Sequence, residues 1–345
     1  MDVSLFDYDL PAPRIAQEPA EPRDASKLLV LDRARGGWED AHFTDLPLWL
    51  EPGDCVVVNE SRVIPARLLG TLDGSGRAVE LLMLRALDGP RWEALVRPGR
   101  RCRVGARVTL ARGAAYATVR EHRPHGARVV EIAAPWSVDE LLERHGLPPL
   151  PPYIERHEAP QPEDRERYQT VYATAKGSVA APTAGLHFTP ALLARLAAAG
   201  VELHRLTLHV GPGTFRPLKT SRVEEHRLEG EIAEVPAATA EAVTKAKAAG
   251  RRVVAVGTTT TRTLEWAADA WGRVSERRGE ADLFIYPDYR FRVVDALVTN
   301  FHLPRSTLLL LVSAFAGREA ILRAYAHAVA SGYRFYSYGD AMLIL

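Results

Sequence analysis

The sequence TPALLARLAAAGVELHRLTLHVGPG, residues 189–213, carries the signals of a helix followed directly by a strand. Thr189 is a favoured N-cap residue, and Pro190 suits the first helical position. Leucines recur at helical spacing after them, and Gly200 can take the left-handed conformation that ends a helix. These signals predict a helix over residues 190–199.

The strand expected at residues 201–210 runs into two glycines, Gly211 and Gly213. In open α/β sheets, ligands bind in the crevice beyond the carboxyl ends of the strands, which is where these glycines fall. The spacing lacks the third glycine of a dinucleotide fingerprint, and no P-loop sequence occurs in the chain. The pattern therefore predicts a ligand loop in an α/β domain, with NAD and P-loop nucleotides excluded as ligands.

The α/β pattern extends through the C-terminal half of the chain. From about residue 185 onward, helical and strand patterns alternate, which is typical of α/β organisation. The alternation continues with a helix at 237–249, a strand at 252–258 and a helix at 261–271.

The spacing of hydrophobic residues changes in the middle of the chain, where short strand-like runs are separated by turn residues. These runs lie at 79–84, 92–96, 107–110 and 128–132. A proline-rich segment, residues 148–162, follows them and leaves little room for regular structure. We therefore predict an α/β catalytic domain formed by residues 1–60 and 150–345, interrupted by an inserted all-β, arginine-rich domain at 61–149.

The composition of the 345-residue chain is that of an ordinary globular protein, with 47% hydrophobic and 25% charged residues. The longest aliphatic run, residues 308–312, is far shorter than the ~20 residues of a membrane helix, and the first residues lack a basic signal region. We expect a cytoplasmic protein with no membrane partner. Cys55 and Cys102 have no partners at metal-ligand spacing, so we expect no metal site.

The net charge of +1 conceals an uneven distribution. Residues 61–130 hold 14 arginines against five acidic residues, and the rest of the chain carries the compensating negative charge. Such a segment attracts a polyanion through release of counterions, so RNA or DNA is a predicted partner. The alternative is a solvated, arginine-rich β surface in a proteome that favours arginine. The clustered arginines are Arg97, Arg100, Arg101, Arg103, Arg107, Arg112, Arg120, Arg123 and Arg128.

Small residues surround an imidazole in the run at 178–189, where His187 lies just before a helix start. Backbone N–H groups at a helix start can bind a carboxylate or a phosphate, and small residues allow a ligand to approach closely. This run is therefore predicted to form a pocket wall. The alternative is a tight turn in which His187 makes ordinary structural hydrogen bonds.

A similar site is predicted at residues 257–262, where threonines and Arg262 follow a strand and precede a helix. Arg262 can hold a carboxylate through two parallel hydrogen bonds. The alternative is that Thr260 or Thr261 only caps the helix.

Two further loops combine polar side chains with chain-breaking residues. Residues 300–304 place Asn300 and His302 before a proline, and residues 336–342 place Asp340 beside a glycine. A lone buried histidine is usually structural, but four polar loops in one α/β half predict a ligand site.

Long motifs occur in a fixed order along the chain, at 6–11, 15–17, 58–68, 168–172, 181–189, 209–217, 257–265, 300–311 and 338–342. On these motifs the chain resembles the S-adenosylmethionine:tRNA ribosyltransferase-isomerase family of queuosine biosynthesis over nearly its whole length. Two positions depart from the family pattern. Asp288 stands where a glycine is expected before Tyr289, which puts the local turn geometry in question, and Thr260 stands where serine is frequent.

The resemblance implies transfer of the ribosyl part of S-adenosylmethionine to 7-aminomethyl-7-deazaguanine at the wobble position of a tRNA with a GUN anticodon. Epoxyqueuosine forms, and adenine and methionine leave. S-adenosylmethionine is then a consumed co-substrate, and no other cofactor is expected. The resemblance also implies a discontinuous α/β domain carrying an inserted β domain, and we expect a monomer.

This chemistry needs a base, because the sulfonium group acidifies the C5′ protons of the ribose. A histidine suits that step, since its pKa lies close to working pH. His209 and His187 are the leading candidates and His302 is the third. Asp340 is a candidate acceptor for the proton of the attacking amine, with a structural carboxylate by a turn as the alternative.

The same motifs supply the residues expected to bind substrate. They are Asn59, Ser61, Arg62, Thr183, Gly185, Phe188, Gly211, Gly213, Thr214, Arg216, Thr258, Thr259, Arg262, Asn300, Phe301 and Tyr338. Arg262 or Arg216 is expected to hold the methionine carboxylate. The aromatic residues are expected to stack on adenine or on the extruded base. Asn59, Ser61 and Arg62 are expected to face the gap between the domains, where an anticodon loop can enter.

Two other classes of protein stay open. A simple S-adenosylmethionine methyltransferase requires an early glycine-rich turn after a strand, which this chain lacks. A non-catalytic RNA-binding protein accounts for the arginine-rich segment but not for the cluster of His, Asn and Gly at strand ends.

Overall fold

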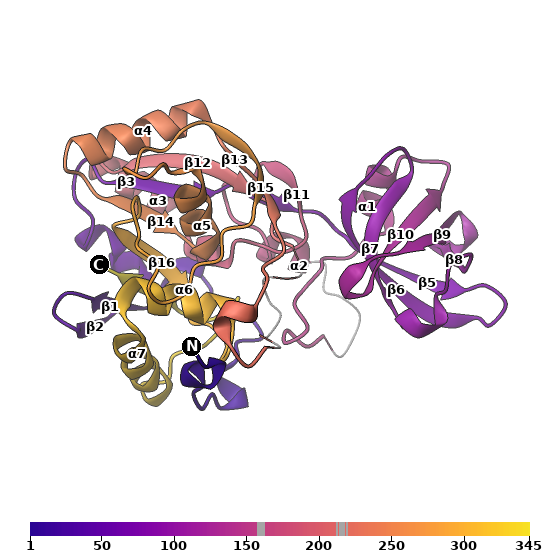
Figure 1. The fold of residues 1–345 in the computed structure, drawn as a ribbon, viewed down its shortest axis with the longest axis horizontal. Helices are drawn as coiled ribbons and strands as arrows, with labels where there is room; N and C mark the ends of the chain where they lie inside the picture. The colour runs from indigo at the N-terminus through magenta and orange to yellow at the C-terminus, as the bar shows by residue number, and fades with distance from the viewer. Residues whose placement is uncertain (157–162, 212, 214–217, 219) are drawn as a thin grey trace.

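A mixed sheet forms the centre of the larger part of the molecule. The computed structural model describes residues 1–345 apart from 157–162, 212, 214–217 and 219. In spatial order the strands of the sheet are β15 (Arg277–Ala281), β13 (Glu231–Val235), β12 (Glu202–Leu208), β3 (Cys55–Asn59), β14 (Val253–Val256), β16 (Ala296–Asn300), β17 (Ala341–Ile344), β1 (Lys27–Asp32) and β2 (Gly37–His42) (Figure 1). The central strands β12, β3, β14 and β16 are parallel, so their carboxyl ends meet at one edge.

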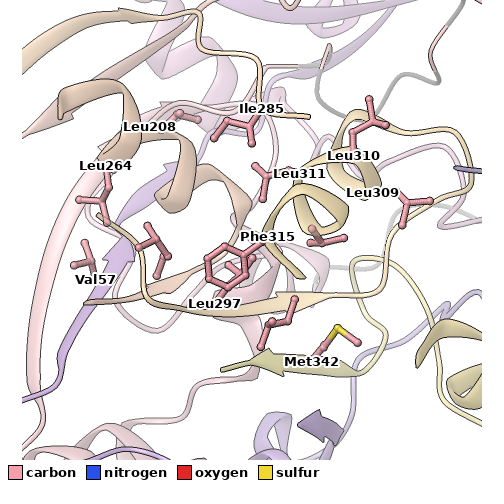
Figure 2. Packing of buried hydrophobic residues seen from close by; sticks show 14 of the residues in the cluster. Val57, Leu208, Leu264, Ile285, Leu297, Leu309, Leu310, Leu311, Phe315 and Met342 are labelled. Atoms are coloured by element: carbon pink, nitrogen blue, oxygen red, sulfur yellow. The ribbon is translucent and has the colours of Figure 1, made fainter. Parts of the chain in front are cut away.

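Helices cover both faces of this sheet. They are α3 (Pro190–Ala198), α4 (Ala237–Ala248), α5 (Thr258–Ala267), α6 (Thr307–Ala316) and α7 (Arg318–Ala330). Side chains alternate along a strand, so β3 sends Val57 into one hydrophobic cluster and its neighbours Val56 and Val58 into another. Figure 2 shows the first cluster, to which Val57, Leu264 and the α6 residue Phe315 all belong. The helix α3 packs in the second cluster.

The predicted helix at 190–199 is confirmed as α3. The Thr189 hydroxyl accepts the Leu192 N–H at 3.1 Å, which caps the helix, and Gly200 has the left-handed φ of 78°. The predicted helix at 237–249 is confirmed as α4.

The predicted helix at 261–271 was placed too late, because α5 begins at Thr258. Gly257 has a φ of 92°, so the chain turns from β14 directly into the helix without a side-chain cap. The hydroxyls of Thr260 and Thr261 donate to the carbonyls of Val256 and Gly257, four residues earlier. Neither threonine therefore caps the helix.

Strands in the middle of the chain close into a barrel, seen at the right of Figure 1. They are β5 (Arg67–Leu72), β6 (Arg77–Ala86), β7 (Arg91–Arg97), β8 (Arg107–Leu110), β9 (Ala115–His122) and β10 (Ala127–Ala133). The helix α1 (Val138–His145) sends its apolar side chains into the barrel core. The predicted combination of an α/β part with a small all-β part is confirmed, whereas its exact boundaries stay a prediction.

The barrel is joined to the rest of the molecule through a short parallel pair. The strands β4 (Ser61–Val63) and β11 (Ala175–Ser178) pair before and after the barrel in the sequence. Among the helices that the structure describes, none is long and apolar enough to cross a membrane.

Candidate active site

A cavity of about 720 Å³ lies between the barrel and the sheet. Its volume is in the range of small-molecule sites, roughly 300–1,000 Å³. The barrel contributes Trp92, Arg123 and His125 to its lining, and the sheet side contributes Gly177 and His209. This cavity is large enough for a nucleoside-sized ligand.

His209 is held in the cavity wall by the end of β3. The side chain of Asn59 donates to the Leu208 carbonyl at 2.9 Å and accepts the Leu208 N–H at 3.0 Å. The Asn59 amide thus forms the two backbone hydrogen bonds of Leu208 that a neighbouring strand would otherwise form. Leu208 is the residue immediately before His209. The Cα of Gly177 lies against the His209 ring, so close that an added Cβ would lie 3.0 Å from its Cε1.

The surroundings of His209 favour a neutral ring. Its Nδ1 is buried and has no hydrogen-bond partner among the residues that the structure describes. Burial lowers the pKa of His209, the positive charge of Arg278 lowers it further, and Glu234 acts in the opposite direction. A neutral imidazole facing a cavity can accept a proton from a bound ligand.

The glycine loop after His209 is attached to a buried ion pair. Glu231, at the start of β13, accepts the Gly211 N–H at 2.6 Å and forms an ion pair with Arg262 of α5. Burial lowers the pKa of Arg262 to about 10. Arg262 was predicted to hold a substrate carboxylate, and in the structure the carboxylate beside it is that of Glu231.

Glu231 was not predicted from the sequence, although a signal exists. The strand β13 alternates between buried and exposed residues, and Glu231 occupies one of the buried positions. An acidic residue at an inward position of an alternating strand requires a buried partner. This requirement identifies Glu231 but does not identify Arg262 as the partner.

Two smaller pockets, of about 30 and 20 Å³, lie at the same edge of the sheet. Thr183 and Asn300 line both of them, and Val210 lines the smaller one as well as the large cavity. The predicted residues that line at least one of the two are Thr183, Thr258, Thr259, Asn300, Phe301 and His302. The structure therefore brings the motifs after β11, β14 and β16 together beside the loop that carries His209.

His187 lies in a closed environment away from the large cavity. Its Nδ1 is 2.7 Å from the Ser26 hydroxyl, its Nε2 is 3.2 Å from the Asn300 amide, and its ring stacks on Phe43. Burial lowers its pKa to about 3. Both ring nitrogens have protein partners, so this environment favours a structural role.

His302 is equally buried. Its Nε2 is 2.8 Å from the Thr299 hydroxyl, and burial lowers its pKa to about 3. Asp340 accepts the backbone N–H groups of Lys27 and Arg334 at 2.9 and 2.7 Å. Its carboxylate thus joins the start of β1 to the segment before β17, which again favours a structural role.

The aromatic residues predicted to stack on substrate are all buried. Phe188 packs edge-on against Phe43, and Tyr338 packs edge-on against Tyr168. Phe301 lies in the core, where it contacts the rings of three other aromatic residues, Tyr325, Tyr333 and Phe335. Gly185 lies against Tyr172, whose hydroxyl a Cβ would meet at 2.1 Å. These positions support the walls of the pockets.

The remaining predicted residues lie near the junction or outside the described residues. Gly211 and Gly213 line the large cavity, whereas Thr214 and Arg216 lie outside the residues that the structure describes. Ser61 is buried at the start of β4 and donates its backbone N–H to Asn59 at 3.0 Å. Arg62 follows it in β4, on the connection to the barrel.

Residues 3–344 match the family described as queuosine biosynthesis protein. The chain belongs to this family. Relatives named S-adenosylmethionine:tRNA ribosyltransferase-isomerase are 56% identical in Moorella thermoacetica and 55% identical in Symbiobacterium thermophilum, each over 100% of both chains. The crystal structure of an S-adenosylmethionine tRNA ribosyltransferase from Thermotoga maritima is 39% identical, with a TM-score of 0.57 over 99% of this chain and 100% of that one.

The residues that the structure describes contain no candidate metal site. No group of three or more His, Cys, Asp or Glu side chains there has the arrangement of a metal site. Cys55 and Cys102 are buried and unlinked, and burial raises the pKa of both thiols.

Proposed function

We propose that the protein transfers the ribosyl part of S-adenosylmethionine to 7-aminomethyl-7-deazaguanine at the wobble position of a tRNA with a GUN anticodon. Epoxyqueuosine forms, and adenine and methionine are released. The observation that carries the proposal is the full-length identity to relatives named S-adenosylmethionine:tRNA ribosyltransferase-isomerase. S-adenosylmethionine is consumed as a co-substrate, no other cofactor takes part, and the protein acts as a cytoplasmic monomer.

In the proposed mechanism, His209 removes a C5′ proton from the ribose and leaves a sulfonium ylide. The electron pair of the ylide forms a C4′–C5′ double bond and breaks the C4′–O4′ bond, and the ring oxygen expels adenine from C1′. The leaving adenine takes up the proton from His209. The amine of the deazaguanine then bonds to C1′, and its proton passes to solvent. An alkoxide finally displaces methionine, which leaves with the electron pair of its carbon–sulfur bond as a neutral thioether. His209 is assigned the first step because it is the candidate histidine that lines the large cavity. Its lowered pKa keeps the ring neutral near pH 7, where it can accept a proton.

The charge of the cavity walls supports this assignment of substrates. The sheet side carries Glu229 and Glu280, and the reaction brings two cations, a sulfonium and an ammonium group. The barrel side holds Arg123 and His125, each of which has a carboxylate beside it, Glu121 and Glu229. The acidic residues of the lining therefore favour the cationic groups of the two substrates.

The test incubates the protein with S-adenosylmethionine and a tRNA carrying 7-aminomethyl-7-deazaguanine, and follows adenine and the modified nucleoside together. We expect adenine and epoxyqueuosine in equal amounts. A matched reaction uses the same tRNA with guanine at the wobble position, and we expect no epoxyqueuosine from it. Formation of S-adenosylhomocysteine would instead indicate methyl transfer, and tRNA binding without either product would indicate a non-catalytic RNA-binding protein.

A further inference from the structure

Ion pairs divide the arginines of the barrel into two groups. All five acidic residues within 61–130, together with Glu131, form ion pairs with arginines that lie mostly on the strands. The paired arginines are Arg67, Arg85, Arg91, Arg107, Arg120 and Arg123. Pairing leaves these side chains with a carboxylate close by, which repels a phosphate.

Eight of the 14 arginines in 61–130 lie outside these ion pairs, and three of the eight lie together at one turn. The other five are Arg62, Arg77, Arg97, Arg112 and Arg128. Arg100, Arg101 and Arg103 lie at and after the single 3-10 turn Gly99–Arg101, between β7 and β8, and all three are exposed. Their side chains form no hydrogen bond or ion pair with any residue in the described part of the chain. We call residues 99–103 the basic turn. The next residue inward, Cys102, is completely buried and anchors the basic turn in the barrel core.

The basic turn lies beside the rim of the large cavity. Arg128 donates to the carbonyls of Gly126 and Ala127 at 2.9 Å and to that of Gly99 at 3.4 Å, so it connects the basic turn to the neighbouring turn at 124–126. That neighbouring turn carries His125, which lines the cavity. The strand β7, which leads into the basic turn, also lines the cavity through Trp92 and Leu95.

We propose that the basic turn binds phosphates of the RNA strand that leads to the base held in the cavity. Arginine forks bind phosphate oxygens through two hydrogen bonds, and such contacts fix the position of the strand without reading its sequence. Because the turn and the cavity share one rim, a strand bound on the turn is directed toward His209. The identity of the polyanion as tRNA rests on the proposed function.

The test compares two triple variants with the same loss of charge. One is Arg100→Gln/Arg101→Gln/Arg103→Gln, and the matched control is Arg91→Gln/Arg107→Gln/Arg120→Gln, which removes arginines that have carboxylate partners. Binding of a tRNA transcript with a GUN anticodon is titrated at several KCl concentrations. Thermal unfolding of each protein verifies that it is folded.

We expect the basic-turn variant to bind the transcript at least about tenfold more weakly near 0.1 M salt. The slope of log K against log salt should fall by about 2, since each phosphate contact contributes ~0.7–0.9. In the full reaction, the KM for tRNA should rise while the KM for S-adenosylmethionine and kcat stay unchanged. The control should keep the affinity and slope of the unchanged protein.

An equal loss of affinity in both variants, or an unchanged salt slope in the basic-turn variant, would overturn the inference. Either result would show that total charge, or another surface, governs RNA binding. The proposed function is tested separately by adenine and epoxyqueuosine formation in the unchanged protein. A protein that binds RNA through the basic turn but forms neither product would contradict the proposed function and not this inference.

Discussion

The imidazole of His209 rests on the bare Cα of Gly177. A Cβ added to Gly177 would lie 3.0 to 3.2 Å from three atoms of the ring, and Gly177 has a φ of 138°, which side-chain-bearing residues rarely adopt. Gly177 of β11 and His209, which follows β12, therefore fit together only when position 177 is glycine. This contact fixes how far the His209 ring can extend into the cavity.

Replacement of Gly177 by alanine should displace His209. We expect the free energy of unfolding to fall by about 1–3 kcal/mol because of the strained φ. The kcat for adenine release should fall by tenfold or more, since misplacement of a catalytic group by about 1 Å can cost ~10²-fold. The control is Gly37→Ala, at an exposed glycine where a Cβ meets nothing within 4 Å. An active Gly177→Ala variant would show that the ring position is not critical.

The pH dependence of the reaction should report His209. Its lowered pKa means that the base is neutral and active at neutral pH, so kcat/KM should be flat there and decline only below the ordinary histidine value of about 6.5. His209→Gln should lower kcat by about 10²–10⁴ and remove this acid limb. His204→Gln, in the strand β12 that leads to His209 but outside the cavity lining, is the matched control. An acid limb that persists in His209→Gln would assign the base to another residue.

The sequence predicted the architecture better than the roles of individual residues. The helix α3 was predicted well because cap, leucine spacing and terminal glycine agree. The strand β5 was not among the predicted strands, and Gly70 lies in its middle. In the structure a Cβ on Gly70 would lie 2.4 Å from the Thr109 carbonyl oxygen of β8, so the close approach of two strands requires this glycine.

The candidate site was only partly predictable, because a motif loop has one side toward the ligand and another toward the core. The run at 178–189 places Thr183 on small pockets and His187 among Ser26, Asn300 and Phe43. Both belong to the same motif, and spacing alone does not tell which side each faces. That information comes from the packing of distant segments.

Buried neutral histidines should make the protein sensitive to acid. The folded pKa values of His187 and His302 are about 3, and the unfolded value is about 6.5, so the unfolded state binds more protons between these values. Stability contributed by each neutral ring is complete above pH 6.5 and is lost as pH falls toward 3. For each histidine, the free energy of unfolding should be lower by about 1 kcal/mol at pH 5.5 than at pH 7.5.

His302→Gln is the variant that measures this effect. Urea unfolding at pH 7.5 and 5.5 gives the difference between the two free energies, from which any general loss of stability in the variant cancels. The variant should lose about 1 kcal/mol less than the unchanged protein between the two pH values. Equal losses in both proteins would mean that His302 becomes protonated in the folded state.

Breaking the ion pair between Glu231 and Arg262 should strongly lower the free energy of unfolding. Glu231→Gln leaves the arginine charge buried beside a neutral amide, and removal of one partner of a buried pair costs about 3–5 kcal/mol. The amide oxygen can still accept the Gly211 N–H. The double variant Glu231→Gln/Arg262→Met should recover much of the loss, since no buried charge remains.

Enzyme kinetics on the same double variant separate two roles of Arg262. If Arg262 acts only through Glu231 and the glycine loop, the KM for S-adenosylmethionine should change little while stability is restored. A KM raised tenfold or more in a stable double variant would instead support direct binding of the methionine carboxylate by Arg262.

The departure from the family pattern at Asp288 should be measurable as backbone strain. Asp288 is exposed and has a φ of 80°, in a turn closed by the bond from the Tyr289 N–H to the Tyr286 carbonyl at 3.1 Å. The left-handed conformation favours glycine, which is the residue expected there from the family. Asp288→Gly should therefore raise the free energy of unfolding by about 0.5–1 kcal/mol. Asp288→Ala should lower it, because alanine has neither the freedom of glycine nor the tolerance of aspartate for this region. Thermal and urea unfolding of both variants would reveal opposite shifts; shifts of the same sign would attribute the effect to the lost carboxylate and not to the backbone.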